Sequence, residues 1–153
     1  MLIDSGLDTV IQGSNIPKFV IGVFFSTSGV RKMVPHLQKV FQADAAHMSF
    51  GKYTLYSCYG TTANGATSAV GFSTHFANES KEVWEIFWNY VKHTRTSMDY
   101  HKNTLITNQA KGLVESIHKV LPAVDHFHCS YHKRQNIMKV FKGGNHLNSC
   151  LWL

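Results

Sequence analysis

Four polar residues with acid–base or metal-binding chemistry lie where predicted strands end: Asp44, Asn108, Cys129 and His132. Asp44 ends an alternating segment, Asn108 follows the apolar pair at 105–106, and Cys129 ends a second short β run, with His132 three residues later. In sheets whose parallel strands are joined by helices, ligands and catalytic groups gather where strands end and helices begin. The functional interpretation of the chain therefore depends on these positions.

Asp44 and Asn108 differ in what they offer a cation. Asp44 supplies a charged carboxylate, whereas the Asn108 amide supplies one neutral oxygen. Hard divalent ions such as Mg²⁺ bind through carboxylates and water, so this pair predicts only weak binding of Mg²⁺ or Mn²⁺ at Asp44. The residues alone favour another interpretation, in which both are polar strand-end residues that form turn hydrogen bonds.

Cys129 and His132 form a Cys-x-x-His pair that could supply two zinc ligands. Structural zinc requires four ligands, and the nearby His126 and His128 alternate onto the face opposite Cys129. The pattern therefore favours a buried thiol and a hydrogen-bonded histidine over bound zinc.

The C-terminal part of the chain is basic. The formal net charge is +6 and the isoelectric point is about 9.3. From His126 onward there is no acidic residue, while Lys133, Arg134, Lys139 and Lys142 are cationic. These residues could bind DNA phosphates, and a solvated helix face explains the charge equally well.

Composition predicts one globular, intracellular domain. The chain has 153 residues, of which 44% are hydrophobic and 16% charged. Its longest apolar run, Phe19 to Phe25, is too short to span a bilayer, and no secretion signal is visible. Three scattered cysteines favour a reducing compartment. We divide the chain into an N-terminal segment with one strand (1–34), a core (35–143) and a short tail (144–153).

The patterns predict strands at 19–25, 37–44, 53–59, 67–76, 105–106 and 124–129. Residues 1–16 are expected to be poorly ordered or to form a short helix, and residues 30–35 are expected to form a connector. A buried stripe predicts a helix over Val83, Ile86, Phe87, Tyr90 and Val91. Further helices are expected at 113–121 and from Cys129 to the glycine pair at 143–144. This order is typical of an α/β fold with a ribonuclease H-like mixed five-stranded sheet, three antiparallel strands then parallel strands, with helices on both faces.

Three ordered segments resemble the Mutator-like element (MULE) transposases. They are QADAAHMSFGKYTLYSCYGTTANGA, HFANESKEVWEIFW and LITNQAKGLVESIHKVLPAVDHFHCSYHKRQN. The first resembles the surroundings of the first catalytic Asp, and the second the Glu-Ser-x-x-x-Trp helix start. The third resembles the pattern that carries the second Asp and the His-x-x-Cys-x-x-His motif. The resemblance covers about residues 35–142.

The resemblance implies ancestral Mg²⁺- or Mn²⁺-dependent DNA cleavage and strand transfer, with Asp44 as the first catalytic carboxylate and Asn108 in place of the second. The family's third carboxylate has no counterpart, because no acidic residue follows Asp125. We therefore expect a degenerate, C-terminally truncated transposase domain that is inactive by itself. DNA, a full-length transposase and a second copy are the expected partners, and the expected location is the nucleus.

Three alternatives remain open. The domain could be a metal-independent module that binds nucleic acid or protein, or a nuclease that tolerates Asn108 or gains a carboxylate from a partner chain. It could also be an expressed fragment without a selected role. The zinc finger that such transposases carry before this domain is not visible, so specific recognition of terminal inverted repeats is not expected.

Overall fold

The computed structural model describes residues 7–13, 20–49, 51–94, 103–110 and 112–140. The strands are β1 (Leu7–Gly13), β2 (Val20–Thr27), β3 (Val40–His47), β4 (Thr54–Thr61), β5 (Thr67–His75), β6 (Thr104–Thr107) and β7 (Asp125–His128). The helices are α1 (Ser28–Met33), α2 (Lys81–Thr94), α3 (Leu113–Val120) and α4 (Ser130–Val140), with a short 3-10 turn at Val34–His36.

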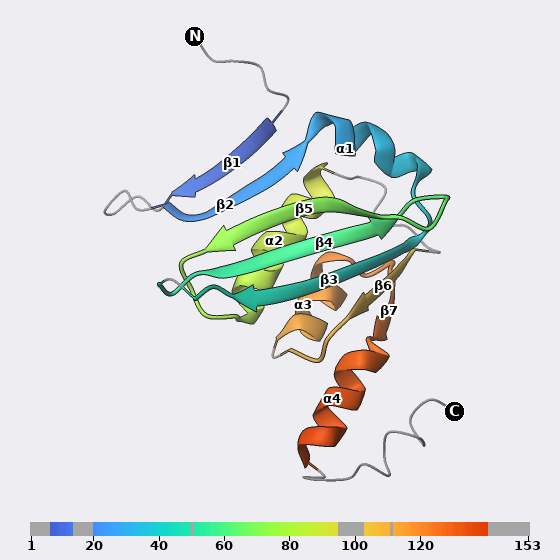
Figure 1. Cartoon of the computed structure of the whole chain (residues 1–153). Coiled ribbons are helices and arrows are strands. Elements are labelled where there is room, and N and C mark those ends of the chain that lie inside the picture. Colours follow the sequence, from blue (N-terminus) through green and yellow to red (C-terminus); the bar gives the residue numbers. More distant parts are fainter. Residues whose placement is uncertain (1–6, 14–19, 50, 95–102, 111, 141–153) are drawn as a thin grey trace.

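All described strands belong to one mixed sheet in the order β1-β2-β5-β4-β3-β6-β7 (Figure 1). Neighbours from β1 to β3 are antiparallel, whereas β3 pairs with β6 and β6 with β7 in parallel. The mixed α/β class and the change from antiparallel to parallel pairing agree with the sequence prediction. The predicted number of five strands is wrong, because the sheet has seven.

The two additional strands come from the N-terminal segment, for which the sequence predicts only one. β1 falls where a disordered stretch or a short helix is expected, because its local pattern is weak, yet it pairs with β2 along its length. β2 in turn pairs with β5, which joins this segment to the main sheet. Pairing with β2 thus makes this segment a strand, although its local sequence pattern does not predict one.

The predicted connector at 30–35 is wrong, because most of it belongs to the helix α1, Ser28–Met33, and to the 3-10 turn that follows. The Thr27 hydroxyl oxygen accepts a hydrogen bond from the Val30 N–H at 3.2 Å and so caps the first turn. A threonine at this position satisfies a backbone donor that would otherwise lack a partner. The chain therefore passes directly from β2 into a helix.

One face of the sheet carries the hydrophobic core. Its fully buried side chains include Phe24, Tyr56 and Cys58 on the strands, Trp84, Phe87, Trp88 and Val91 on α2, and Leu113 and Ile117 on α3. Cys58 is a core residue, as its place in the strand predicts. Figure 1 shows α2 and α3 together behind the sheet, whereas no described helix lies over the front of β3 and β4. The predicted helix cover on both faces is therefore absent from the described residues.

Two polar contacts join helices α2 and α3. Lys119 on α3 forms an ion pair with Glu85 on α2 at 2.6 Å, and the Lys92 ammonium group donates to the Val120 carbonyl oxygen at 3.0 Å. Gly112 precedes α3 with a φ of 77°, and an added Cβ there would lie 2.6 Å from the Lys81 Cβ. This close approach requires glycine. None of the described helices has the length and apolar character needed to cross a membrane.

Candidate functional site

Asp44 lies in the middle of β3 rather than at its end, which corrects the sequence prediction. The strand continues to His47 because it pairs with β4 as far as Thr54. Its parallel partner β6 is shorter, and the last pair in that ladder joins Ala43 to Thr107. Asp44 is thus the first residue of β3 beyond the end of β6, and the following residue of the β6 chain is Asn108.

The side chains of Asp44 and Asn108 bind each other. The Asn108 Nδ2 donates to the Asp44 Oδ1 at 2.9 Å, and the Asn108 Oδ1 accepts from the Ala110 N–H at 3.0 Å. Turning the amide over would place oxygen against oxygen and nitrogen against nitrogen, so its surroundings fix its direction. The sequence predicts that the two residues are related, and the structure places them in direct contact.

The Asp44 carboxylate remains open to solvent. Its side chain is 50% exposed, and its Oδ1 also accepts from the Ala45 N–H at 2.9 Å. The Ser57 hydroxyl on β4 donates to the Asp44 carbonyl oxygen at 3.2 Å. Oδ1 therefore receives two hydrogen bonds, while Oδ2 faces His132.

His132 lies in the first turn of α4, with its Nε2 3.8 Å from the Asp44 Oδ2. This distance is too long for a hydrogen bond but permits electrostatic attraction when the imidazole is protonated. The buried His132 Nδ1 has no hydrogen-bond partner in the described part of the chain. His132 therefore borders the Asp44–Asn108 pair, although the two sequence motifs lie far apart in the chain.

Cys129 connects β7 to α4. Its N–H donates to the Thr107 carbonyl oxygen at 2.7 Å, and its carbonyl oxygen accepts from the Lys133 N–H at 3.0 Å. The thiol is free and partly buried. Across the described ranges, no three His, Cys, Asp or Glu side chains are grouped so that they could hold a metal ion.

His126 and His128 lie apart from His132, on the side of α3. Their rings are 5.0 Å apart, and the His118 ring of α3 is 6.5 Å from that of His126. His126 Nε2 and the Thr107 hydroxyl are hydrogen-bonded at 2.8 Å. Burial lowers the pKa of His126 below its ordinary value, and His128 and His118 lower it further. These histidines form a separate cluster, in agreement with the predicted alternation.

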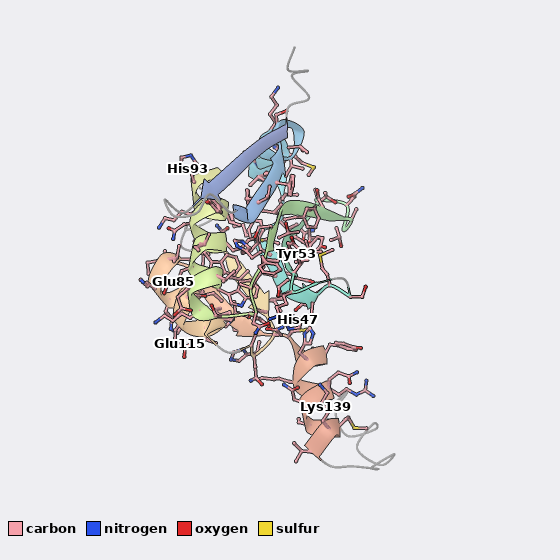
Figure 2. The ribbon with its side chains drawn as sticks, turned by 90° about the vertical axis from the view of Figure 1, so that its left-hand side faces the viewer. His47, Tyr53, Glu85, His93, Glu115 and Lys139 are labelled. Atoms are coloured by element: carbon pink, nitrogen blue, oxygen red, sulfur yellow. The ribbon has the colours of Figure 1, made fainter. Side chains whose placement is uncertain are left out.

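The predicted DNA-binding residues lie along α4. Lys133 and Lys139 are exposed, Arg134 is partly buried, and Lys142 lies outside the described residues. Figure 2 shows Lys139 on α4, which extends away from the sheet. The described helix contains no acidic residue, so its charge is uniformly positive.

Sequence reasoning misses Thr107 and Ser57, which support the site from neighbouring strands. The Thr107 hydroxyl lies 2.9 Å from the Asn108 carbonyl oxygen and also contacts His126, while Ser57 contacts the Asp44 backbone. The register between β3 and β4 would have indicated Ser57, because it places Ser57 directly opposite Asp44. The amino-acid sequence does not reveal this register.

Comparison with known proteins identifies the class. The family model described as the MULE transposase domain matches residues 41–136, which is more than half of the chain. The chain therefore belongs to the MULE transposase domain family. A search among curated proteins found no match.

Proposed function

We propose that this chain is a transposase-derived domain that has lost the ancestral two-metal DNA cleavage and strand transfer. The loss arises because Asn108 replaces the second metal-binding carboxylate and binds Asp44 itself. The observation that carries the proposal is the 2.9 Å hydrogen bond from the Asn108 Nδ2 to the Asp44 Oδ1. The Asn108 amide stands where the family resemblance implies a second carboxylate.

Electrostatics explains the effect of this one residue. Two carboxylates at hydrogen-bonding distance repel each other unless a proton or a cation lies between them, and paired metals fill this role in phosphodiester chemistry. The Asn108 amide instead presents an N–H to Asp44, so the pair is satisfied without a cation. One carboxylate then has to hold Mg²⁺ or Mn²⁺ nearly alone, which predicts weak binding.

The strand order supports the ancestry. We infer that β5-β4-β3-β6-β7 forms a ribonuclease H-like core, since its three antiparallel strands are followed by two parallel ones. The family resemblance implies metal chemistry at the first and fourth core strands, and the contact between Asp44 and Asn108 supports their assignment as what remains of that site. DNA as the partner and the nucleus as the location belong to the same proposal.

Manganese binding tests the proposal directly. We expect the natural chain to show weak Mn²⁺ binding by calorimetry, and Asn108→Asp to bind Mn²⁺ roughly tenfold or more tightly because it restores the second carboxylate. Asp44→Asn in the Asn108→Asp background should abolish the gain. Tight Mn²⁺ binding by the natural chain that requires Asp44 would overturn the proposal.

Nicking of supercoiled plasmid in Mg²⁺ and in Mn²⁺ provides the functional test. We expect no nicking by the natural chain, which should match Asp44→Ala. Nicking by Asn108→Asp alone would place the whole defect at residue 108. Nicking by the natural chain that disappears in Asp44→Ala would show an active nuclease instead.

A second candidate function is metal-independent nucleic-acid binding. The uniformly basic α4 favours it, because Lys133 and Lys139 are exposed and have no acidic neighbour within the described helix. Phosphate contacts of this kind give binding that weakens with salt and ignores divalent ions. Fluorescence anisotropy with and without a chelator should therefore give the same affinity, whereas a metal requirement would contradict this function.

A further inference from the structure

Two large aromatic side chains are exposed where β7 meets α4. Phe127 is 58% exposed on β7 and Tyr131 is 56% exposed in the first turn of α4. Single exposed hydrophobic residues are common, but two exposed aromatics lie within five residues of each other here, and exposed rings suit a ligand with flat apolar faces. They occur beside the most basic part of the described chain.

Packing of α4 against the protein core does not explain the residues on this surface. None of its described residues is buried, and in Figure 1 it extends from the end of β7 away from the sheet. Lys133 and Lys139 are exposed on it, and no acidic residue lies within it. The charge of this surface therefore fits a polyanion rather than a basic or neutral partner.

Rings and cations together select a particular kind of polyanion. In a duplex the faces of the bases are stacked inside, so exposed aromatic rings cannot reach them. In a single strand every base has a free face that can stack on Phe, Tyr or Trp, while lysines contact the phosphates.

We propose that Phe127, Tyr131 and Lys139 form a binding surface for single-stranded nucleic acid. Bases stack on the two rings, and phosphates lie against Lys139, which lies eight residues after Tyr131 and therefore on nearly the same side of α4. This inference rests on the proposed function, because it names the form of nucleic acid that the transposase-derived domain binds.

The position of the surface links it to the Asp44–Asn108 pair. Phe127 belongs to the outward face of β7 together with Asp125, whereas His126 and His128 face the opposite side. Phe127 pairs with Ile106 of β6, which lies two residues before Asn108. Residues two apart on a strand share one face and lie about 7 Å apart, so Phe127 and Asn108 lie on the same face of the sheet. An unpaired strand held by Phe127 and Tyr131 would thus lie on the face of the sheet that carries Asn108.

The test measures binding of the full chain, without divalent ions, to three fluorescent probes. They are an oligothymidine of roughly twelve nucleotides, the corresponding duplex and an abasic strand with the same number of phosphates. We expect the oligothymidine to bind at least about fivefold more tightly than the other two, since each stacked base contributes. Equal affinity for all three would overturn the proposal, because phosphates alone would then explain binding.

Substitutions separate stacking from general apolar contact. Phe127→Leu and Tyr131→Leu keep an apolar side chain but remove the ring, and each should weaken oligothymidine binding about fivefold or more. Phe127→Tyr and Tyr131→Phe should bind like the natural chain. Since both residues are exposed, their substitution should leave the thermal unfolding transition unchanged. Loss in the leucine variants together with a lowered unfolding temperature would count against a direct contact.

Phe76→Leu is the matched control. Phe76 is 55% exposed, nearly as much as Phe127, but it follows β5, and three strands separate β5 from β7 in the sheet. Binding should be unaffected by this change. Equal loss in Phe76→Leu would overturn the assignment to the β7–α4 surface.

Lys139 provides an independent measurement. Lys139→Ala should reduce the slope of log affinity against log salt by about 0.7, the value for one phosphate contact to a single strand. An unchanged slope would exclude Lys139 from the surface. Absence of binding to any nucleic acid would overturn this inference and the DNA partnership, whereas the Mn²⁺ experiments on Asn108 would still decide the metal-site proposal.

Discussion

At the scale of single residues, one change of side-chain chemistry decides how the site is stabilised. Asp44 and Asn108 come together because the β6 ladder ends one residue before each of them. With an amide at 108, the contact is a charge-assisted hydrogen bond, which stabilises the pair without a cation. With a second carboxylate, the same geometry would need a cation. Under the function that we propose, the site has therefore lost metal affinity and gained a stabilising hydrogen bond.

Buried histidines give the fold a dependence on pH. His75 is 4% exposed, its ring lies edge-on to Tyr56, and its Nε2 is hydrogen-bonded to the Ser73 hydroxyl at 2.6 Å. Burial lowers the pKa of His75 below its ordinary value. As pH falls below about 6.5, the unfolded chain binds a proton that the folded chain excludes, so stability decreases until the folded pKa is also passed.

We therefore expect His75→Gln to show a smaller loss of unfolding free energy between about pH 7 and pH 5 than the natural chain. Urea unfolding at several pH values measures this slope. His126, whose pKa is lowered in the same direction, should leave part of the slope in the variant. His36→Gln, at an exposed position, serves as the comparison variant that also lacks one histidine. An identical slope in His75→Gln would contradict this assignment.

At the scale of elements, the position of β6, and with it Asn108, depends on how α3 begins. Gly112 starts α3 with a positive φ, at a place where the Lys81 backbone of α2 approaches closely. The loop between Asn108 and α3 is only a few residues long. A side chain at 112 would therefore push α3 away from the start of α2.

Gly112→Ala should lower the free energy of unfolding by roughly 2 to 4 kcal/mol, the sum of a left-handed backbone and an overpacked contact. Gly65→Ala is the matched control, because Gly65 has a φ of 83° but nothing within 4 Å of an added Cβ. Gly65→Ala should lower the free energy of unfolding by about 1 kcal/mol, because only the left-handed backbone opposes the alanine side chain. Urea unfolding compares them, and equal losses would show that the Lys81 contact yields without cost.

At the scale of the whole molecule, the N-terminal segment shares the core of the MULE-like part. Phe24 of β2 is 1% exposed, and its ring lies 6.1 Å from that of Phe87 and 5.5 Å from that of Tyr90 on α2. The continuous sheet and this aromatic contact join residues that the sequence assigns to separate segments. The described parts should therefore unfold together.

Phe24→Ala should lower the free energy of unfolding by about 3–5 kcal/mol, as expected for loss of a buried aromatic ring. Circular dichroism and the fluorescence of Trp84 and Trp88 should report one shifted transition. The exposed Phe76 again serves for comparison, since Phe76→Ala should change stability by about 0.5 kcal/mol or less. Two separated transitions would instead support an independent N-terminal unit.

The sequence by itself determined the α/β class, the helix α2, most strands of the main sheet and the pairing of Asp44 with Asn108. Strong hydrophobic periods and an ordered family pattern carry this information along the chain. Only the tertiary structure revealed β1 and α1, because their local patterns are weak and a partner strand and a cap define them. It also decided the direction of the Asn108 amide, the approach of His132 to Asp44 and the support from Thr107 and Ser57. Strand register and side-chain orientation set those contacts, and both depend on residues distant in sequence.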